Sequence, residues 1–252
     1  MKILICILLP TLLLISCGTK ESAAPPDTSQ AAESMVATEK LYSQAADKLV
    51  SQYSKALMST LMAALNENGP AYAVKICQAK AQDIAVAHSA EGWSVKRVSE
   101  KWRNVMDRPD TSEVQILKMF ANPGAGDDYL TNWSGPDSAR VFHYYKKIVV
   151  SQMCLQCHGD LQTVDLDLYK KVKIDYPYDK ATGYKVGDLR GMFVIKAQYP
   201  AGDAMAQLLA DGVDITEFTR PDTTAGDTIA DDTVAGDTVA EDTAGDGPAT
   251  TE

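Results

Sequence analysis

The sequence contains few cysteines, histidines and aromatic residues, and it has no excess of basic residues over acidic ones. It has five cysteines and three histidines in 252 residues, and aromatic residues make up 7% of the chain. The net charge is −10, but twelve acids against one arginine lie from Asp211 onward, so the remainder is nearly neutral. A nearly neutral domain lacks the basic face that nucleic-acid binding requires, so we expect no nucleic-acid partner.

Aromatic residues are almost absent after residue 209, where the unit AGDT or a close variant repeats. Such a segment cannot bury enough apolar area to offset the entropy lost on ordering. We therefore expect residues 210–252 to be a disordered acidic tail that acts as a spacer. A calcium-binding or adhesive acidic strip is the alternative.

The apolar stretch at the N-terminus is too short for an ordinary membrane span. Residues 1–16, MKILICILLPTLLLIS, combine one early lysine with an apolar core, which is typical of a secretory signal peptide. The stretch ends in LISC, a lipobox, which predicts lipidation of Cys17; ordinary secretion is the alternative. Residues 17–34 are small, polar and proline-containing, which suits a flexible tether. These features predict a bacterial cell-envelope protein that is anchored to the membrane through Cys17 and faces the periplasm or exterior.

Residues 35–209 are long enough for one domain. Apolar periodicity and turn residues predict helices over 33–66, 71–92, 112–120 and 166–176. Segments rich in β-branched and aromatic residues predict strands over 93–99, 139–150 and 189–199. Helices that precede strands joined by mixed segments favour an α+β fold with an antiparallel sheet.

The run MCLQCHGD contains a Cys-x-x-Cys-His sequence formed by Cys154, Cys157 and His158. A thioredoxin-like redox pair would need a βαβ context, which the surrounding pattern lacks. A zinc site would need further ligands, and no second paired spacing of cysteine or histidine exists. Covalent attachment of haem c fits best, with thioether bonds at both cysteines and His158 as proximal iron ligand.

A distal iron ligand is harder to assign. Four of the five cysteines are accounted for. Cys6 leaves with the signal peptide, Cys17 is lipidated, and Cys154 and Cys157 bind the haem. Cys77 is the thiol that remains, on the apolar face of its predicted helix. It is either a distal ligand or a small buried hydrophobe. His88, His143 and several methionines are rival ligands.

Four stretches resemble the PAS-like c-type haem-binding domain family first known from cyanobacteria. They are AVKICQAKAQDIA, VKRVSEKWRNVMDRPDTSE, FHYYKKIVVSQMCLQCHGD and YPYDKATGYKVGDLRGMFVIK, and together they cover about Ala71 to Lys196. The family has proline where this chain has Val105, so the turn there differs. The resemblance implies a PAS-like sheet that carries covalent haem.

The same resemblance implies that Cys77 is the distal iron ligand opposite His158. Arg97 and Arg103 match basic positions of the family, where they would contact the haem propionates; surface solvation is the alternative. A redox or small-ligand sensor, with a diatomic gas as one possible ligand class, is the function expected first. An electron-transfer cytochrome that works between envelope partners is the alternative. We do not expect an enzyme, because a Cys77 ligand would fill the distal site.

Overall fold

The computed structural model describes residues 28–219 apart from residues 123, 125 and 163. The predicted signal peptide, Cys17, most of the predicted tether and the tail beyond residue 219 lie outside the described residues. The main elements are α1 (Thr28–Ala87), β1 (Trp93–Val98), α2 (Thr111–Ala121), β2 (Tyr129–Ser134), β3 (Val141–Val149), α3 (Leu155–His158), α4 (Leu166–Asp175), β4 (Leu189–Gln198) and α5 (Asp203–Ala210). Short 3-10 turns include η1 (Val105–Asp107), η3 (Gln152–Cys154) and η4 (Ile215–Phe218).

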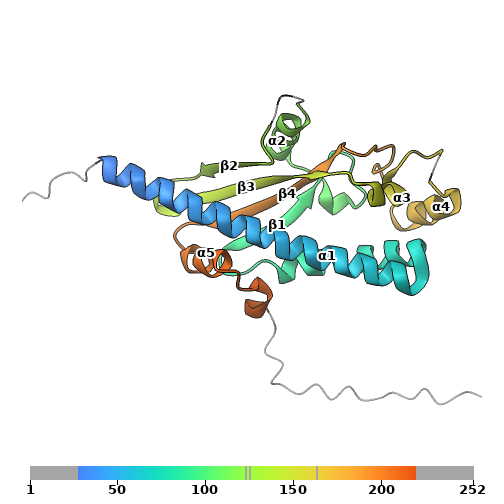
Figure 1. Ribbon diagram of the computed structural model, residues 1–252, viewed down its shortest axis with the longest axis horizontal. Coiled ribbons are helices and arrows are strands. Elements are labelled where there is room, and N and C mark those ends of the chain that lie inside the picture. The colour runs from blue at the N-terminus through green and yellow to red at the C-terminus, as the bar shows by residue number, and fades with distance from the viewer. Residues whose placement is uncertain (1–27, 123, 125, 163, 220–252) are drawn as a thin grey trace, which may run out of the picture. The chain divides into compact units, whose positions relative to one another are not determined.

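The four strands form one antiparallel sheet in the order β1-β4-β3-β2 (Figure 1). Val95 on β1 and Tyr144 on β3 both lie opposite Ile195 on β4, which places β4 between them. This arrangement confirms the predicted α+β class with an antiparallel sheet. The strands expected over 93–99, 139–150 and 189–199 correspond to β1, β3 and β4.

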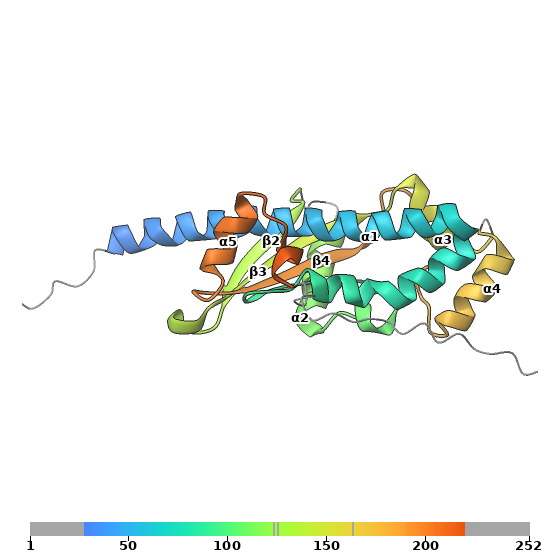
Figure 2. The same cartoon turned by 90° about the horizontal axis from the view of Figure 1, so that it is seen from below.

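Helix α1 consists of two limbs separated by a break at Asn68 and Gly69, which have non-helical backbone angles. Gly69 has a φ of 74°, a conformation that glycine adopts without steric cost. Pro70 then starts the second limb, where its missing N–H costs no helical hydrogen bond. The two helices predicted on either side of this break are confirmed, and Figure 2 shows the second limb turning back from the far end of the first.

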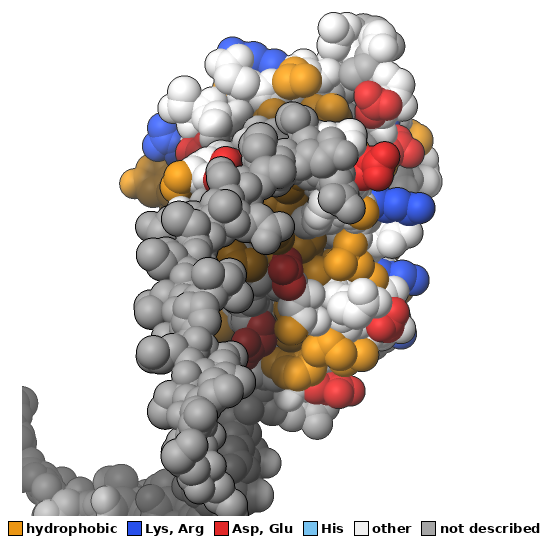
Figure 3. All heavy atoms as spheres, turned by 90° about the vertical axis from the view of Figure 1, so that its left-hand side faces the viewer, with side chains coloured by type: hydrophobic (Ala, Val, Ile, Leu, Met, Phe, Trp, Pro, Cys, Tyr) orange, Lys and Arg blue, Asp and Glu red, His pale blue; other side chains and the backbone are white. Residues whose placement is uncertain are grey.

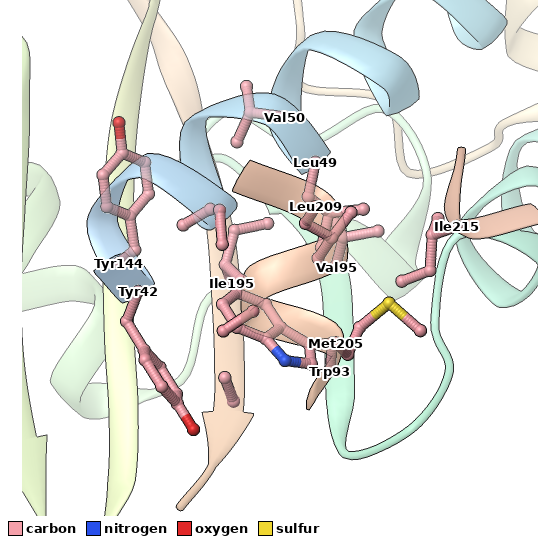
Figure 4. Packing of buried hydrophobic residues seen from close by; sticks show 14 of the residues in the cluster. Tyr42, Leu49, Val50, Trp93, Val95, Tyr144, Ile195, Met205, Leu209 and Ile215 are labelled. Carbon is pink, nitrogen blue, oxygen red and sulfur yellow. The ribbon is translucent and has the colours of Figure 1, made fainter. Parts of the chain in front are cut away.

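The main core lies between α1, α5 and one face of the sheet (Figure 4). Alternating residues on β1 point Trp93 and Val95 into this core while Ser94 and Lys96 lie on the other face. The indole N–H of Trp93 donates to the carbonyl of Gly202 at 3.0 Å, which joins β1 to the start of α5. The other face of the sheet is covered by α2, whose Leu117 and Phe120 contact β1, β3 and β4.

Two predicted boundaries of the domain are wrong. The helix begins at Thr28, inside the segment that was expected to be a tether to residue 34. At the other end the chain stays packed beyond residue 209, where a disordered tail was expected to start. Ile215 is fully buried in the main core, and the Gln52 side chain donates to the carbonyl of Val213 at 2.7 Å. The packed domain therefore extends to Thr219, whose hydroxyl donates to the carbonyl of Ala87 at 2.7 Å.

Within the part of the chain that the structure describes, no helix is long and apolar enough to cross a bilayer. Figure 3 shows the end of the domain where α1 begins, and acidic, basic and apolar side chains are interspersed on that face.

Candidate functional site

The Cys-x-x-Cys-His run lies directly after β3, on η3 and the single turn of α3. Cys154 packs against Val150 and Tyr184, whereas Cys157 packs against a cluster that joins α1 to α4. Both thiols are partly buried and free, as is that of Cys77. The two cysteines of the run therefore lie between two small apolar clusters, and neither is engaged in a disulfide.

The imidazole of His158 is held by one hydrogen bond with a defined direction. Its Nδ1 lies 2.8 Å from the carbonyl oxygen of Ala181. Because a carbonyl only accepts hydrogen bonds, Nδ1 carries the proton and Nε2 keeps its lone pair. Burial, followed by the nearby Arg103 and Arg190 charges, lowers the pKa of His158 well below its ordinary value. His158 is therefore a neutral imidazole with one nitrogen available to a metal.

The segment from Tyr176 to Tyr184 forms a cradle around this run. The backbone N–H of Tyr184 donates to the carbonyl of His158 at 3.0 Å, and that of Gly183 donates to Gly159 at 2.8 Å. Gly159 must be glycine, because a Cβ there would lie 2.6 Å from the carbonyl oxygen of Leu155. The cradle thus fixes the backbone on which His158 is mounted.

Cys77 lies on the second limb of α1, one turn after Val74. Val74 belongs to the apolar cluster against which Cys157 packs, so the two cysteines lie at the same end of the domain. Burial raises the pKa of the Cys77 thiol, while the Arg97 guanidinium opposes this, Cys157 adds to it and Arg103 opposes it. Arg97 and Arg103 also act on His158, so Cys77 and His158 share one electrostatic environment. Iron ligation by Cys77 stays a prediction.

Three guanidinium groups surround this environment. Arg97 pairs loosely with Asp107, with 3.6 Å between Nη2 and Oδ2. Arg103 is mostly buried, and its guanidinium donates to the carbonyl of Cys157 and pairs with Asp179. Arg190, which sequence analysis missed, donates weakly to the carbonyl of Lys101 at 3.4 Å, and burial lowers its pKa. An arginine in the otherwise apolar run LRGMFVI was the sequence signal that could have identified it.

This arrangement fits a haem better than a bare metal ion. Among the described residues, no three histidine, cysteine or acidic side chains converge in a way that could hold a metal ion. A zinc site at the run therefore has no support there. A covalently attached haem would take from the protein an imidazole for its iron, two thiols for its vinyl groups and cations for its propionates. The residues that could supply these groups are His158, Cys154, Cys157, Arg97 and Arg190.

The two rival histidines are engaged elsewhere. His88 is buried at the end of α1, where its Nδ1 bonds the carbonyl of Ile84 at 2.7 Å and its ring packs on Tyr53. His143 lies on the strand β3, and its Nε2 shares a hydrogen bond of 2.7 Å with the hydroxyl of Ser134. Neither contacts the run in this structure.

The model of the family described as Tll0287-like matches residues 27–197. The chain belongs to the Tll0287-like family. The solved structure entitled "Crystal structure of the cyanobacterial heme-protein Tll0287" is 26% identical and matches over 69% of this chain and 97% of that chain, with a TM-score of 0.41. No curated protein matches. The matched Tll0287-like region spans α1 to β4 and thus contains the whole candidate site.

Proposed function

We propose that this chain is an exported, membrane-anchored protein that carries one covalently bound haem c and acts as a redox or small-ligand sensor. The observation that supports it most is the hydrogen bond from Nδ1 of His158 to Ala181, which leaves Nε2 for iron beside two free thiols. Membership of the Tll0287-like family, together with the haem protein of that name, supports haem binding.

Bound haem supplies a one-electron Fe(III)/Fe(II) couple. The protein would hold it through Cys154, Cys157 and His158. Arg97 and Arg190 would bind its propionates, because each has donors that the protein leaves weakly used.

Iron ligation by Cys77 would depend on whether its thiol has lost its proton, so this ligand could bind and leave. A thiol binds iron as the thiolate, and burial opposes loss of its proton while Arg97 and Arg103 favour it. Burial has the larger effect and the pKa of the Cys77 thiol is raised, so formation of the thiolate depends on the two arginines. Extra negative charge in the site weakens the help that the arginines give, so the state of Cys77 would follow the redox state. This conditional ligation is the basis of the proposed sensor.

Electron transfer is the second candidate, and one observation favours it. Val149 and Met153, which both precede Cys154 in the chain, are 47% and 42% exposed. Apolar side chains at the edge of a redox group suit brief docking of a partner. Val186, two residues after the cradle, is also exposed, at 57%.

The covalent bond is tested by acid–acetone extraction of the full chain, produced in a host that matures c-type cytochromes. The pigment should stay with the polypeptide. Pigment in the organic phase, or no pigment at all, would refute the proposal.

The choice between sensor and carrier is tested with Cys77→Ala. The variant should keep covalent haem but lose the low-spin thiolate EPR signal. Its reduction potential should be higher than that of the wild type, and it should bind carbon monoxide more readily. An unchanged ferric spectrum would show that a residue other than Cys77 is the distal ligand, and it would favour the carrier.

A further inference from the structure

Arg103 was expected at a haem propionate, but its donors are committed to protein groups. Its side chain is 12% exposed, and its Nη2 donates to the carbonyl of Cys157 at 2.6 Å. The same nitrogen lies 3.4 Å from the carbonyl of Ala181, and Nε donates to Oδ1 of Asp179 at 3.3 Å. Arg103 therefore bridges the Cys-x-x-Cys-His run and the cradle.

Asp179 completes this bridge from inside the cradle. Its side chain is fully buried, and Oδ1 accepts the backbone N–H of Ala181 at 2.8 Å as well as the bond from Arg103. Oδ2 is buried and has no hydrogen-bond partner among the described residues. Every bond that Asp179 makes could be made by the oxygen of an asparagine. The negative charge is thus not needed for the geometry, and a buried charge is costly to keep.

The carbonyl of Ala181 links this pair to the axial histidine. It accepts from Nδ1 of His158 at 2.8 Å, and its own N–H is fixed by Asp179 two residues earlier. Arg103 holds the carbonyl of Cys157, the residue just before His158. The ring is therefore oriented from both sides by one ion pair. Orientation of an axial ligand by such outer partners tunes the metal that it binds.

We propose that Arg103 and Asp179 are positioning residues for His158, and that the Asp179 charge sets the balance between the two redox states of the site. This proposal rests on the proposed haem function. A negative charge near iron favours Fe(III), and Asp179 also offsets the positive charge of Arg103. Removal of the Asp179 charge therefore favours Fe(II).

The test compares three variants of the haem-loaded full chain. Asp179→Asn keeps the shape and removes the charge. Arg103→Lys keeps the charge and removes the forked donor that reaches two carbonyls at once. Asp167→Asn is the control, because that carboxylate is 82% exposed on α4. Redox titration, ferric EPR and melting temperature are measured for each.

Asp179→Asn should retain covalent haem and shift the ferric-to-ferrous ratio, at a fixed ambient potential, roughly threefold or more toward ferrous. Arg103→Lys should shift that ratio less but broaden the ferric EPR signal, because the ring loses one of its two supports. The control should change neither.

A potential and an EPR signal that stay at wild-type values in both variants would refute the proposal, whatever happens to the melting temperature. A purely structural role would lower the melting temperature alone. Absence of covalent haem from the wild type would instead refute the proposed function, so the two failures are distinguishable.

Discussion

Truncation of the chain after Leu209 should destabilise the haem domain, whereas truncation after Thr219 should not. The first truncation removes Ile215, which is fully buried, and burial of such a side chain contributes about 1.5–3 kcal/mol. It also removes both backbone partners of Gln52, the carbonyl of Val213 at 2.7 Å and the N–H of Ile215 at 3.2 Å. Each such bond contributes about 1 kcal/mol.

The total is about 3.5–5 kcal/mol, which for a domain of this size lowers the melting temperature by roughly 10 °C. Both truncated chains should be compared with the full chain by thermal unfolding followed at the haem absorbance and by circular dichroism. Ile215→Ala in the full chain should lower the free energy of unfolding by about 2–5 kcal/mol, because it removes the same buried side chain. Equal melting temperatures for the two truncated chains would refute the packing described for residues 210–219.

Three further changes test other parts of the description. Cys17→Ser should move the haem domain from the membrane to the soluble fraction with its spectrum unchanged; fractionation that still finds it in the membrane would indicate another anchor. Gly159→Ala should reduce the yield of haem-loaded protein, measured as haem absorbance per polypeptide, because its Cβ would lie 2.6 Å from the carbonyl oxygen of Leu155; a normal yield would contradict the tight approach. Arg190→Gln should lower the reduction potential in redox titration, because removal of a cation stabilises Fe(III), while Arg140→Gln, whose arginine pairs with Asp137, should have no effect.

Local patterns in the sequence were sufficient for the long elements of this fold. The apolar spacing of α1, the break at Gly69 and Pro70, and the β-branched runs of β3 and β4 each carry their own signal over many residues. The elements that were missed are short; the longest of them are β2, with six residues, and α5, with eight. Over such lengths periodicity does not distinguish a packed segment from a loop.

The end of the domain was missed for a different reason. Composition is an average over a segment, and one buried isoleucine does not change the acidic average after residue 209. Ile215 becomes core because α1 and α5 leave a place for it, which is a tertiary property.

The candidate site also contains residues that a local sequence pattern identifies and residues that only the folded structure identifies. Cys154, Cys157 and His158 lie within five residues, so their spacing alone predicts haem attachment, which stays a prediction. The proposed roles of Asp179 and Arg190 depend on backbone groups and charges that only the folded chain brings together. A sequence pattern cannot show that Arg103 reaches the carbonyl of Cys157, which lies 54 positions later.

The reversal of α1 at Gly69 has a consequence for the biogenesis of the protein. If the Cys-x-x-Cys-His run attaches haem, as we propose, enzymes of cytochrome maturation could act on it before the chain folds, because it is a short linear segment. Cys77 reaches that end only after the second limb has turned back and α4 has packed beside it, where Gln78 donates to the carbonyl of Asp175 at 2.7 Å. Haem loading and the arrival of Cys77 would then be separate steps in time. A newly loaded chain would pass through a stage in which haem is attached and the thiol has not yet arrived.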